Sequence, residues 1–225
     1  MKLAFVSAGA AQALVHATAK AAGLAVEGSF GAVGAMLEKL NAGEAADVVI
    51  LTRAQVEQLA KEGRVLAETV ADLGTVATAI AVRATDPPPD ISGEAPLRAA
   101  LLAADTIYFP DPARATAGIH FASVLDKLGI AEKVRDKIRN FPNGTTSMRE
   151  MAGASGHPLG CTQATEIIAT AGIELVGALP RGFDLDTTYT AAVDSRAADP
   201  KAARDFVARL TSPQGKRERQ ALGFA

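Results

Sequence analysis

KLAFVSAGAAQALVHATAKAA, residues Lys2–Ala22, joins a short apolar run directly to an alanine-rich, helix-prone run. The first part, Lys2–Val6, predicts a buried β-strand, and the stretch from about Ala11 to Ala22 predicts a helix. Only small residues, Ser7–Ala10, separate the two. The apolar run is too short and too interrupted for a secretory leader, so we expect a strand here and no export signal in the chain as given.

The same strand-then-helix order recurs along the chain. Such alternation predicts an α/β fold with a largely parallel sheet. Helix starts are also marked: Thr52 with Gln55 and Ser147 with Glu150 fit capping boxes, and Asp199 precedes a proline at the first helical position. The predicted strands are Lys2–Val6, Ala25–Ser29, Asp47–Leu51, Thr75–Val82, Thr106–Phe109, Leu159–Thr162 and Ile173–Ala178.

Two breaks in this pattern predict two lobes. The run Asp86–Asp90 contains three consecutive prolines, which forbid both helix and strand ladder and indicate an extended surface loop. A β-prone, threonine-rich run follows Asp184 and leads into the terminal helices. We therefore expect residues 1–82 and 194–225 to form one lobe and residues 83–193 to form the other, with hinges near Arg83 and Val193.

Composition and motifs exclude several classes of protein. The 23 Lys and Arg residues nearly balance 25 Asp and Glu residues, which argues against nucleic acid as a partner, and no apolar run is long enough to enter a membrane as a span. The single cysteine, Cys161, excludes an internal disulfide. The phosphate-binding glycine motifs are absent, and His16, His120 and His157 are widely spaced, so we expect no cofactor and no metal site.

The recurring chemical feature is a set of small or hydroxyl residues where a strand ends and a helix begins. These junctions expose backbone N–H groups and the positive end of the helix dipole, which together bind anions without a basic side chain. In a parallel sheet, such junctions lie at the carboxyl ends of the strands, where ligands bind. The five candidates are Ser7–Ala10, Gly31–Gly34, Ala115–Gly118, Thr145–Ser147 and Cys161–Gln163.

These segments, in this order, make the chain resemble the periplasmic molybdate-binding proteins, which are solute receptors of ABC importers. The resemblance implies a type II periplasmic-binding-protein fold, with two α/β lobes joined by two crossover strands and a ligand cleft between them. It also implies a monomer that delivers its ligand to an importer membrane subunit in the periplasm; the missing export signal leaves a cytoplasmic location open. The residues that carry the resemblance are Phe5–Gly9, Gly28–Gly31, Ala42–Val49, Asp111–Pro112, Ala117–Ile119, Leu125–Gly129, Pro158–Gly160, Phe206, Leu210, Ser212–Gly215 and Leu222–Phe224.

The chain departs from the pattern of that family at the ligand positions. The resemblance implies a ligand serine where this chain has Gly9, and further serines where it has Ala32, Val33 and Gly34. Thr145 stands where the family uses a backbone amide, and Gln163 stands where it has a tyrosine. Because a desolvated tetrahedral dianion needs nearly every donor in its pocket, we expect molybdate and tungstate to bind poorly.

We therefore predict a solute-binding protein that closes its two lobes around a small oxyanion or organic carboxylate. Arg114, ahead of Arg149 and Arg181, is the expected bidentate partner for a carboxylate. Two alternatives stay open: a cytosolic small-molecule sensor, and an enzyme in which Glu166 and Asp111 transfer protons on a small carboxylate or ketone. The predicted ligand-binding residues are Ser7, Gly9, Ala10, Ala32, Val33, Arg114, Thr116, Ala117, Thr145 and Gln163.

Overall fold

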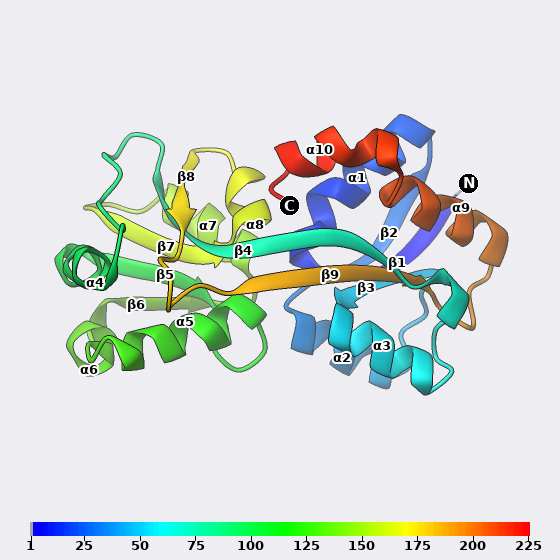
Figure 1. Cartoon of the computed structure of the whole chain (residues 1–225), viewed down its shortest axis with the longest axis horizontal. Coiled ribbons are helices and arrows are strands. Elements are labelled where there is room, and N and C mark those ends of the chain that lie inside the picture. Colours follow the sequence, from blue (N-terminus) through cyan, green and yellow to red (C-terminus); the bar gives the residue numbers. More distant parts are fainter. Residues whose placement is uncertain (1) are drawn as a thin grey trace. The chain divides into compact units, whose positions relative to one another are not determined.

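The structure, a computed structural model, describes residues 2–225 and divides them into two compact α/β units. Unit 1 comprises Met1–Val76 and Thr187–Ala225, and unit 2 comprises Ala77–Asp186. Two strands, β4 (Ala71–Arg83) and β9 (Asp186–Val193), belong to both units (Figure 1). The α/β class and the two crossover strands therefore agree with the sequence.

Unit 1 is a sheet with the strand order β2-β1-β3-β9-β4, in which β1 pairs parallel with both β2 and β3. Helices α1, α9 and α10 lie on one face of this sheet, and α2 and α3 lie on the other (Figure 1). The rings of Phe5 and Phe206 meet edge to face at 5.3 Å in its core. The elements are β1 (Lys2–Ala8), η1 (Gly9–Ala11), α1 (Gln12–Ala22), β2 (Ala25–Gly31), α2 (Val33–Asn41), β3 (Val48–Thr52), α3 (Arg53–Lys61), η2 (Ala67–Thr69), α9 (Pro200–Leu210), η4 (Pro213–Gly215) and α10 (Lys216–Ala221).

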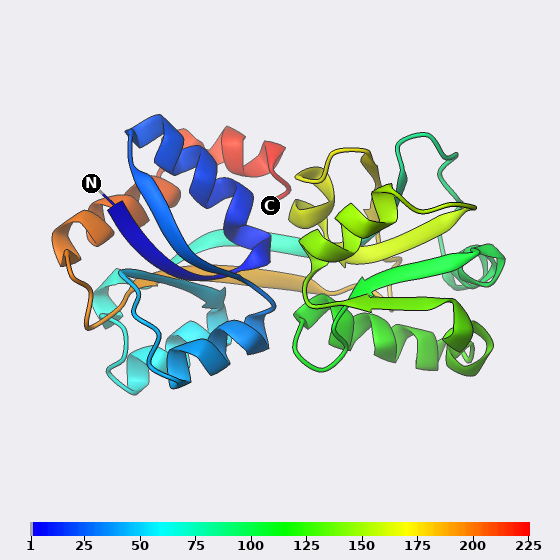
Figure 2. The ribbon, with the colours of Figure 1, turned by 180° about the vertical axis from the view of Figure 1, so that it is seen from behind.

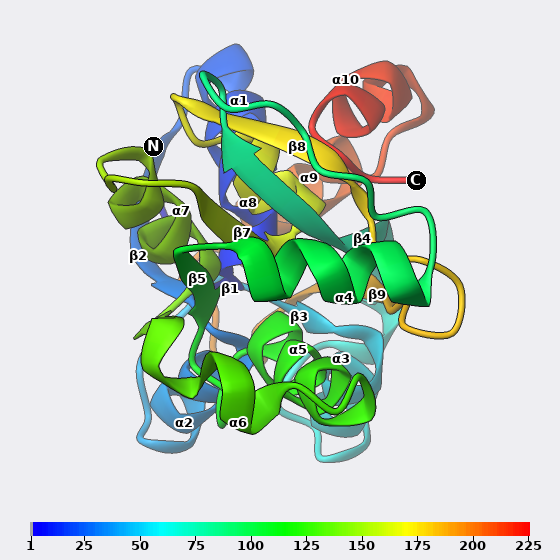
Figure 3. The same ribbon diagram turned by 90° about the vertical axis from the view of Figure 1, so that its left-hand side faces the viewer.

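Unit 2 continues from β4 in the order β4-β7-β5-β6, with β8 paired to β4. Helices α5 and α6 lie on one side of this sheet, and α7 and α8 lie on the other (Figure 3). The buried core on the α5 side includes Ile80, Phe109, Phe121 and Cys161. The elements are α4 (Glu94–Ala103), β5 (Thr106–Pro110), α5 (Thr116–Lys127), α6 (Ala131–Val134), η3 (Arg135–Lys137), β6 (Ile138–Phe141), α7 (Gly144–Ala152), β7 (Pro158–Gln163), α8 (Ala164–Ile168) and β8 (Ile173–Ala178).

Local details differ from the sequence prediction at three places. The capping box at Thr52 is wrong because the Thr52 hydroxyl donates to Gln55 Oε1 at 2.7 Å and caps no backbone N–H. The capping box from Ser147 to Glu150 is wrong because both residues lie inside α7, whose N-cap is Asn143. Strand β6 was not predicted, since its four residues include two exposed polar ones at the edge of the sheet.

The divisions between the units lie at Val76/Ala77 and Asp186/Thr187, several residues earlier than the sequence breaks at 82/83 and 193/194. The first division lies inside β4, where no turn residue marks the position, and the second lies after the first residue of β9. The Pro-rich break instead marks the end of β4, where the chain leaves the sheet of unit 2.

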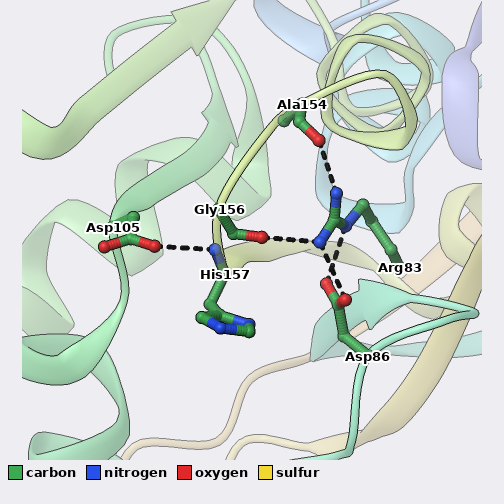
Figure 4. A network of polar contacts seen from close by, with 6 residues as sticks. All are labelled: Arg83, Asp86, Asp105, Ala154, Gly156 and His157. Carbon is green, nitrogen blue, oxygen red and sulfur yellow. Dashed lines mark hydrogen bonds and ion pairs between the residues drawn. The ribbon is translucent and has the colours of Figure 1, made fainter.

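Arg83, the last residue of β4, is held by a network within unit 2 (Figure 4). Its Nε and Nη2 donate to the two carboxylate oxygens of Asp86 at 2.7 and 2.8 Å. Its Nη1 and Nη2 also donate to the carbonyl oxygens of Ala154 and Gly156 at 2.5 and 2.6 Å. The guanidinium of Arg83 lowers the pKa of Asp86 through this hydrogen-bonded pair. Arg83 thus ties the Pro-rich loop to the segment that precedes β7.

We expect Arg83→Ala to lower the urea midpoint of unfolding, because it removes four hydrogen bonds that join two loops of unit 2. Arg135→Ala is the matched control, since Arg135 is largely exposed and pairs only with neighbouring acidic side chains on the surface. Equal midpoints for the two variants would contradict a structural role for the Arg83 network.

Candidate functional site

The carboxyl ends of three parallel strands bring three of the predicted junctions of unit 2 to one sheet edge. Strand β5 pairs parallel with β7 on one side and with β6 on the other, and Ile107 lies opposite both Leu159 and Ile138. Figure 2 shows these three strands side by side. Their ends lead into α5, α7 and α8, so the segments around Ala117, Thr145 and Gln163 are neighbours at this edge.

Helix α5 begins at this edge without a side-chain cap. Its N-cap is Ala115, with extended backbone angles (φ −94°, ψ 128°), and Thr116 and Ala117 follow in the first turn. A side chain at Gly118 would collide with the carbonyl oxygens of Pro110 and Asp111, so a glycine is needed where the helix packs against the preceding loop. The first-turn N–H groups of a helix have no partner within it and carry the positive end of its dipole. The start of α5 is therefore suited to an anion.

Arg114 directly precedes the N-cap of α5 and is exposed. The loop before it is shaped by Asp111, whose Oδ1 accepts a hydrogen bond from the Ala113 N–H at 2.7 Å. The structure thus places Arg114 beside the uncapped helix start, as the sequence order implied.

Gln163 provides the polar side chain at the end of β7. It is 3% exposed, and neither its amide nitrogen nor its amide oxygen has a hydrogen-bond partner among the described residues. Its cross-strand partner is Thr78 of β4, whose buried hydroxyl also lacks a partner in the described part of the chain. Gln163 and Cys161 alternate onto the same face of β7, and Cys161 packs in the core with Phe121 of α5. The unpaired amide therefore lies on the α5 side of the sheet.

The start of α7 differs because side chains of the protein lie at its first turn. Asn143 Oδ1 accepts from the Thr146 N–H at 2.8 Å. The carboxylate of Glu166, on α8, accepts from the Thr162 hydroxyl at 2.5 Å, and its Oε2 lies so close to Gly144 that a Cβ atom there would collide with it. Thr145 follows Gly144 in this turn and is half-buried.

Burial controls the chemistry of the two ionisable groups here. Glu166 is 7% exposed, and its pKa is raised because the cost of desolvating the carboxylate exceeds the lowering effect of its hydrogen bonds. Burial likewise raises the pKa of the Cys161 thiol well above its usual range, so this cysteine is not an activated nucleophile.

Unit 1 presents a second edge of the same kind. In the parallel pair of β1 and β2, Ala8 lies opposite Gly31, so the two junctions that follow these strands are adjacent. Helix α2 begins after Ala32 (φ −59°, ψ 137°) and η1 begins after Ala8, both without a side-chain cap. The Ser7 hydroxyl is buried and donates to the Ala8 carbonyl at 3.0 Å. The candidate donors of unit 1 are therefore backbone N–H groups, from Gly9, Ala10, Ala32 and Val33.

Residues 2–225 contain no group of three His, Cys, Asp or Glu side chains that could hold a metal ion. Within the same residues, no helix is long and apolar enough to cross a membrane.

Sequence reasoning missed Thr78, Asn143 and the role of Glu166. Asn143 carried a readable signal, because asparagine before a glycine and two threonines is a favourable N-cap. Thr78 and Glu166 gave none, since their importance comes from pairing between segments that are distant in the chain.

Comparisons with known proteins identify a family and a fold for this chain. The sequence profile of the family described as bacterial extracellular solute-binding protein matches residues 4–225. Among solved structures, the periplasmic molybdate-binding protein of Azotobacter vinelandii superposes with a TM-score of 0.75 at 20% identity, covering 99% of this chain and 98% of that one. The sulfate-binding protein of Mycobacterium tuberculosis gives a TM-score of 0.71 at 19% identity, covering 100% and 86%.

One curated relative is an enzyme. Aconitate isomerase of a Pseudomonas species is 29% identical over 179 residues, which cover 79% of this chain and 66% of that protein. The chain therefore spans just under two thirds of the length of this relative.

We expect Gln163→Leu to raise the free energy of unfolding by about 1 kcal/mol, because it removes a buried amide that no group satisfies. Thr162→Val, one residue earlier on β7, is expected to lower it, since that hydroxyl donates to Glu166. Urea denaturation of both variants tests whether the unfolding free energy rises in Gln163→Leu and falls in Thr162→Val. A loss of stability in Gln163→Leu would mean that the amide is satisfied.

Glu166→Gln tests the raised pKa through the pH dependence of stability. Below the ordinary glutamate pKa of 4.5 the protonated carboxyl contributes its full stability, and this contribution is lost as the pH rises through the raised folded-state pKa. Glutamine does not ionise. The unfolding free energy of the variant, relative to the native protein, should therefore increase as the pH rises above the ordinary value of 4.5, with a slope of at most about 1.4 kcal/mol per pH unit. If the unfolding free energies of the variant and the native protein changed in parallel with pH, the raised pKa of Glu166 would be contradicted.

Proposed function

The chain belongs to the bacterial extracellular solute-binding proteins, and from that premise we propose that it captures a small organic carboxylate carrying more than one acidic group. The observation that carries the proposal is the pair of uncapped strand-to-helix edges, one in each unit, where α2 and α5 begin after alanine. Backbone N–H groups at such positions bind a carboxylate as well as any other anion.

The side chains at these edges favour a carboxylate over an inorganic oxyanion. In unit 1, the Ser7 hydroxyl near Gly9 already donates to the Ala8 carbonyl. In unit 2, the planar guanidinium of Arg114 suits the planar, bidentate geometry of a carboxylate. The relative named aconitate isomerase, whose name refers to a tricarboxylate, is consistent with this class of ligand.

The remaining parts of the proposal follow from the family. We propose that the two units close on the ligand as β4 and β9 bend where they pass between them, and that donors from both units favour the closed state. The closed, ligand-loaded monomer would then be recognised by the membrane subunits of an ABC importer, which places it in the periplasm.

A second candidate function is isomerisation of an unsaturated carboxylate by proton transfer, because the curated relative is an isomerase. The two carboxyl groups considered for this role are poorly placed as bases. Glu166 is buried and accepts from the Thr162 hydroxyl, and Asp111 accepts from the Ala113 N–H. We therefore rank capture above catalysis, and activity with trans-aconitate is the discriminating test.

We expect citrate, cis-aconitate or trans-aconitate to raise the thermal unfolding midpoint, and sulfate and molybdate to leave it unchanged. A ligand that binds only the folded protein stabilises it by about 2.7 kcal/mol at a hundredfold its dissociation constant. Calorimetry should then show that Arg114→Ala weakens binding of the stabilising carboxylate by about tenfold to a hundredfold. Arg135→Ala, an exposed arginine of unit 2, is the matched control and should bind normally.

The outcomes separate the alternatives. A panel in which no carboxylate stabilises the native protein, or in which molybdate binds best, contradicts the proposal. Conversion of trans-aconitate to its cis isomer, followed by NMR of the ligand, would establish the isomerase function in its place.

A further inference from the structure

The N-terminus of α7 already contains an anion supplied by the protein. The carboxylate of Glu166 lies against Gly144, the first residue of α7, and accepts from the Thr162 hydroxyl at 2.5 Å. The Thr146 N–H of the same turn donates to Asn143 Oδ1. The first turn of α7 is therefore occupied by side chains of the protein itself.

The backbone at Gly144 leaves room for the Glu166 carboxylate. Gly144 is buried, and a Cβ atom there would collide with Glu166 Oε2 and with the Thr162 hydroxyl. The glycine thus leaves the space that lets the carboxylate reach the helix amides. The buried position of Glu166, at 7% exposure, keeps water from competing for those donors.

The neighbouring α5 shows the opposite condition at the same sheet edge. It begins at Ala115 with no side-chain cap, and the unpaired amide of Gln163 lies on its side of the sheet. The two helix starts therefore differ: α7 has Asn143 as its N-cap and the Glu166 carboxylate against its first residue, whereas α5 has no side-chain cap.

We propose that Glu166 is a built-in anion that determines ligand specificity, so that unit 2 accepts a single carboxylate at α5 and rejects a tetrahedral dianion that would need α7 as well. This inference rests on the proposed function, because it assigns the charge that a ligand presents to unit 2. Glu166 acts here by occupying donors and needs no contact with the ligand.

Glu166→Ala tests the inference by emptying a space the size of a carboxylate. We expect the variant to unfold at a lower temperature than the native protein, and formate to restore the midpoint saturably, because formate would replace the missing carboxylate at the α7 amides. Formamide, a neutral molecule of the same shape, should not restore it. Glu150→Ala is the matched control, because it removes an exposed carboxylate from α7 itself. The unfolding midpoint of this variant should not respond to formate.

Specificity provides the second readout. Calorimetry should show at least a tenfold gain in molybdate or sulfate affinity for Glu166→Ala over the native protein, and no gain for Glu150→Ala. If Glu166→Ala does not fold alone, refolding in formate and in formamide replaces the thermal measurement, and formate alone should rescue it. Rescue by both compounds or by neither, or an unchanged oxyanion affinity, overturns the inference. If the native protein binds no carboxylate, the proposed function is contradicted. The formate experiment still decides whether the Glu166 carboxylate occupies the start of α7.

Discussion

Parallel pairing of three neighbouring strands in each unit is the constraint on which the rest of the structure depends. It places β2, β1 and β3 in unit 1, and β7, β5 and β6 in unit 2, with their carboxyl ends at a common edge. Each strand must then return through a helix, and each helix starts at that edge with unpaired backbone donors. The candidate site is therefore a consequence of topology before any special side chain is considered.

Alanine at these helix starts has a cost that the proposed binding role would explain. Serine, threonine, aspartate or asparagine at an N-cap stabilises a helix by about 1 kcal/mol relative to alanine. The chain uses aspartate for α9 and asparagine for α7, but alanine for α2 and α5. The buried amide of Gln163 likewise has no hydrogen-bond partner among residues 2–225. In the proposed function, these are the positions where free donors would bind an anion.

The sequence was most informative where local chemistry decides the structure. The apolar runs located β1 and β8, small residues located the starts of α2 and α5, and Asp199 before proline located α9. It was least informative where the outcome depends on contacts between distant segments. The crossing inside β4 carries no turn residue, and the polar edge strand β6 lacks an apolar pattern. The position of the Glu166 carboxylate against Gly144 depends on how α7 packs on α8.

The central claim is that backbone amides of uncapped helix starts hold the ligand while those of α7 do not. An amide NMR titration of the native protein with the best-binding carboxylate tests it most directly, because each backbone N–H reports on its own environment. The account predicts large shifts for the amides of Ala32 and Ala117 and small ones for Gly144 and Thr145. Shifts concentrated at Gly144 and Thr145, with Ala32 and Ala117 unaffected, would contradict it.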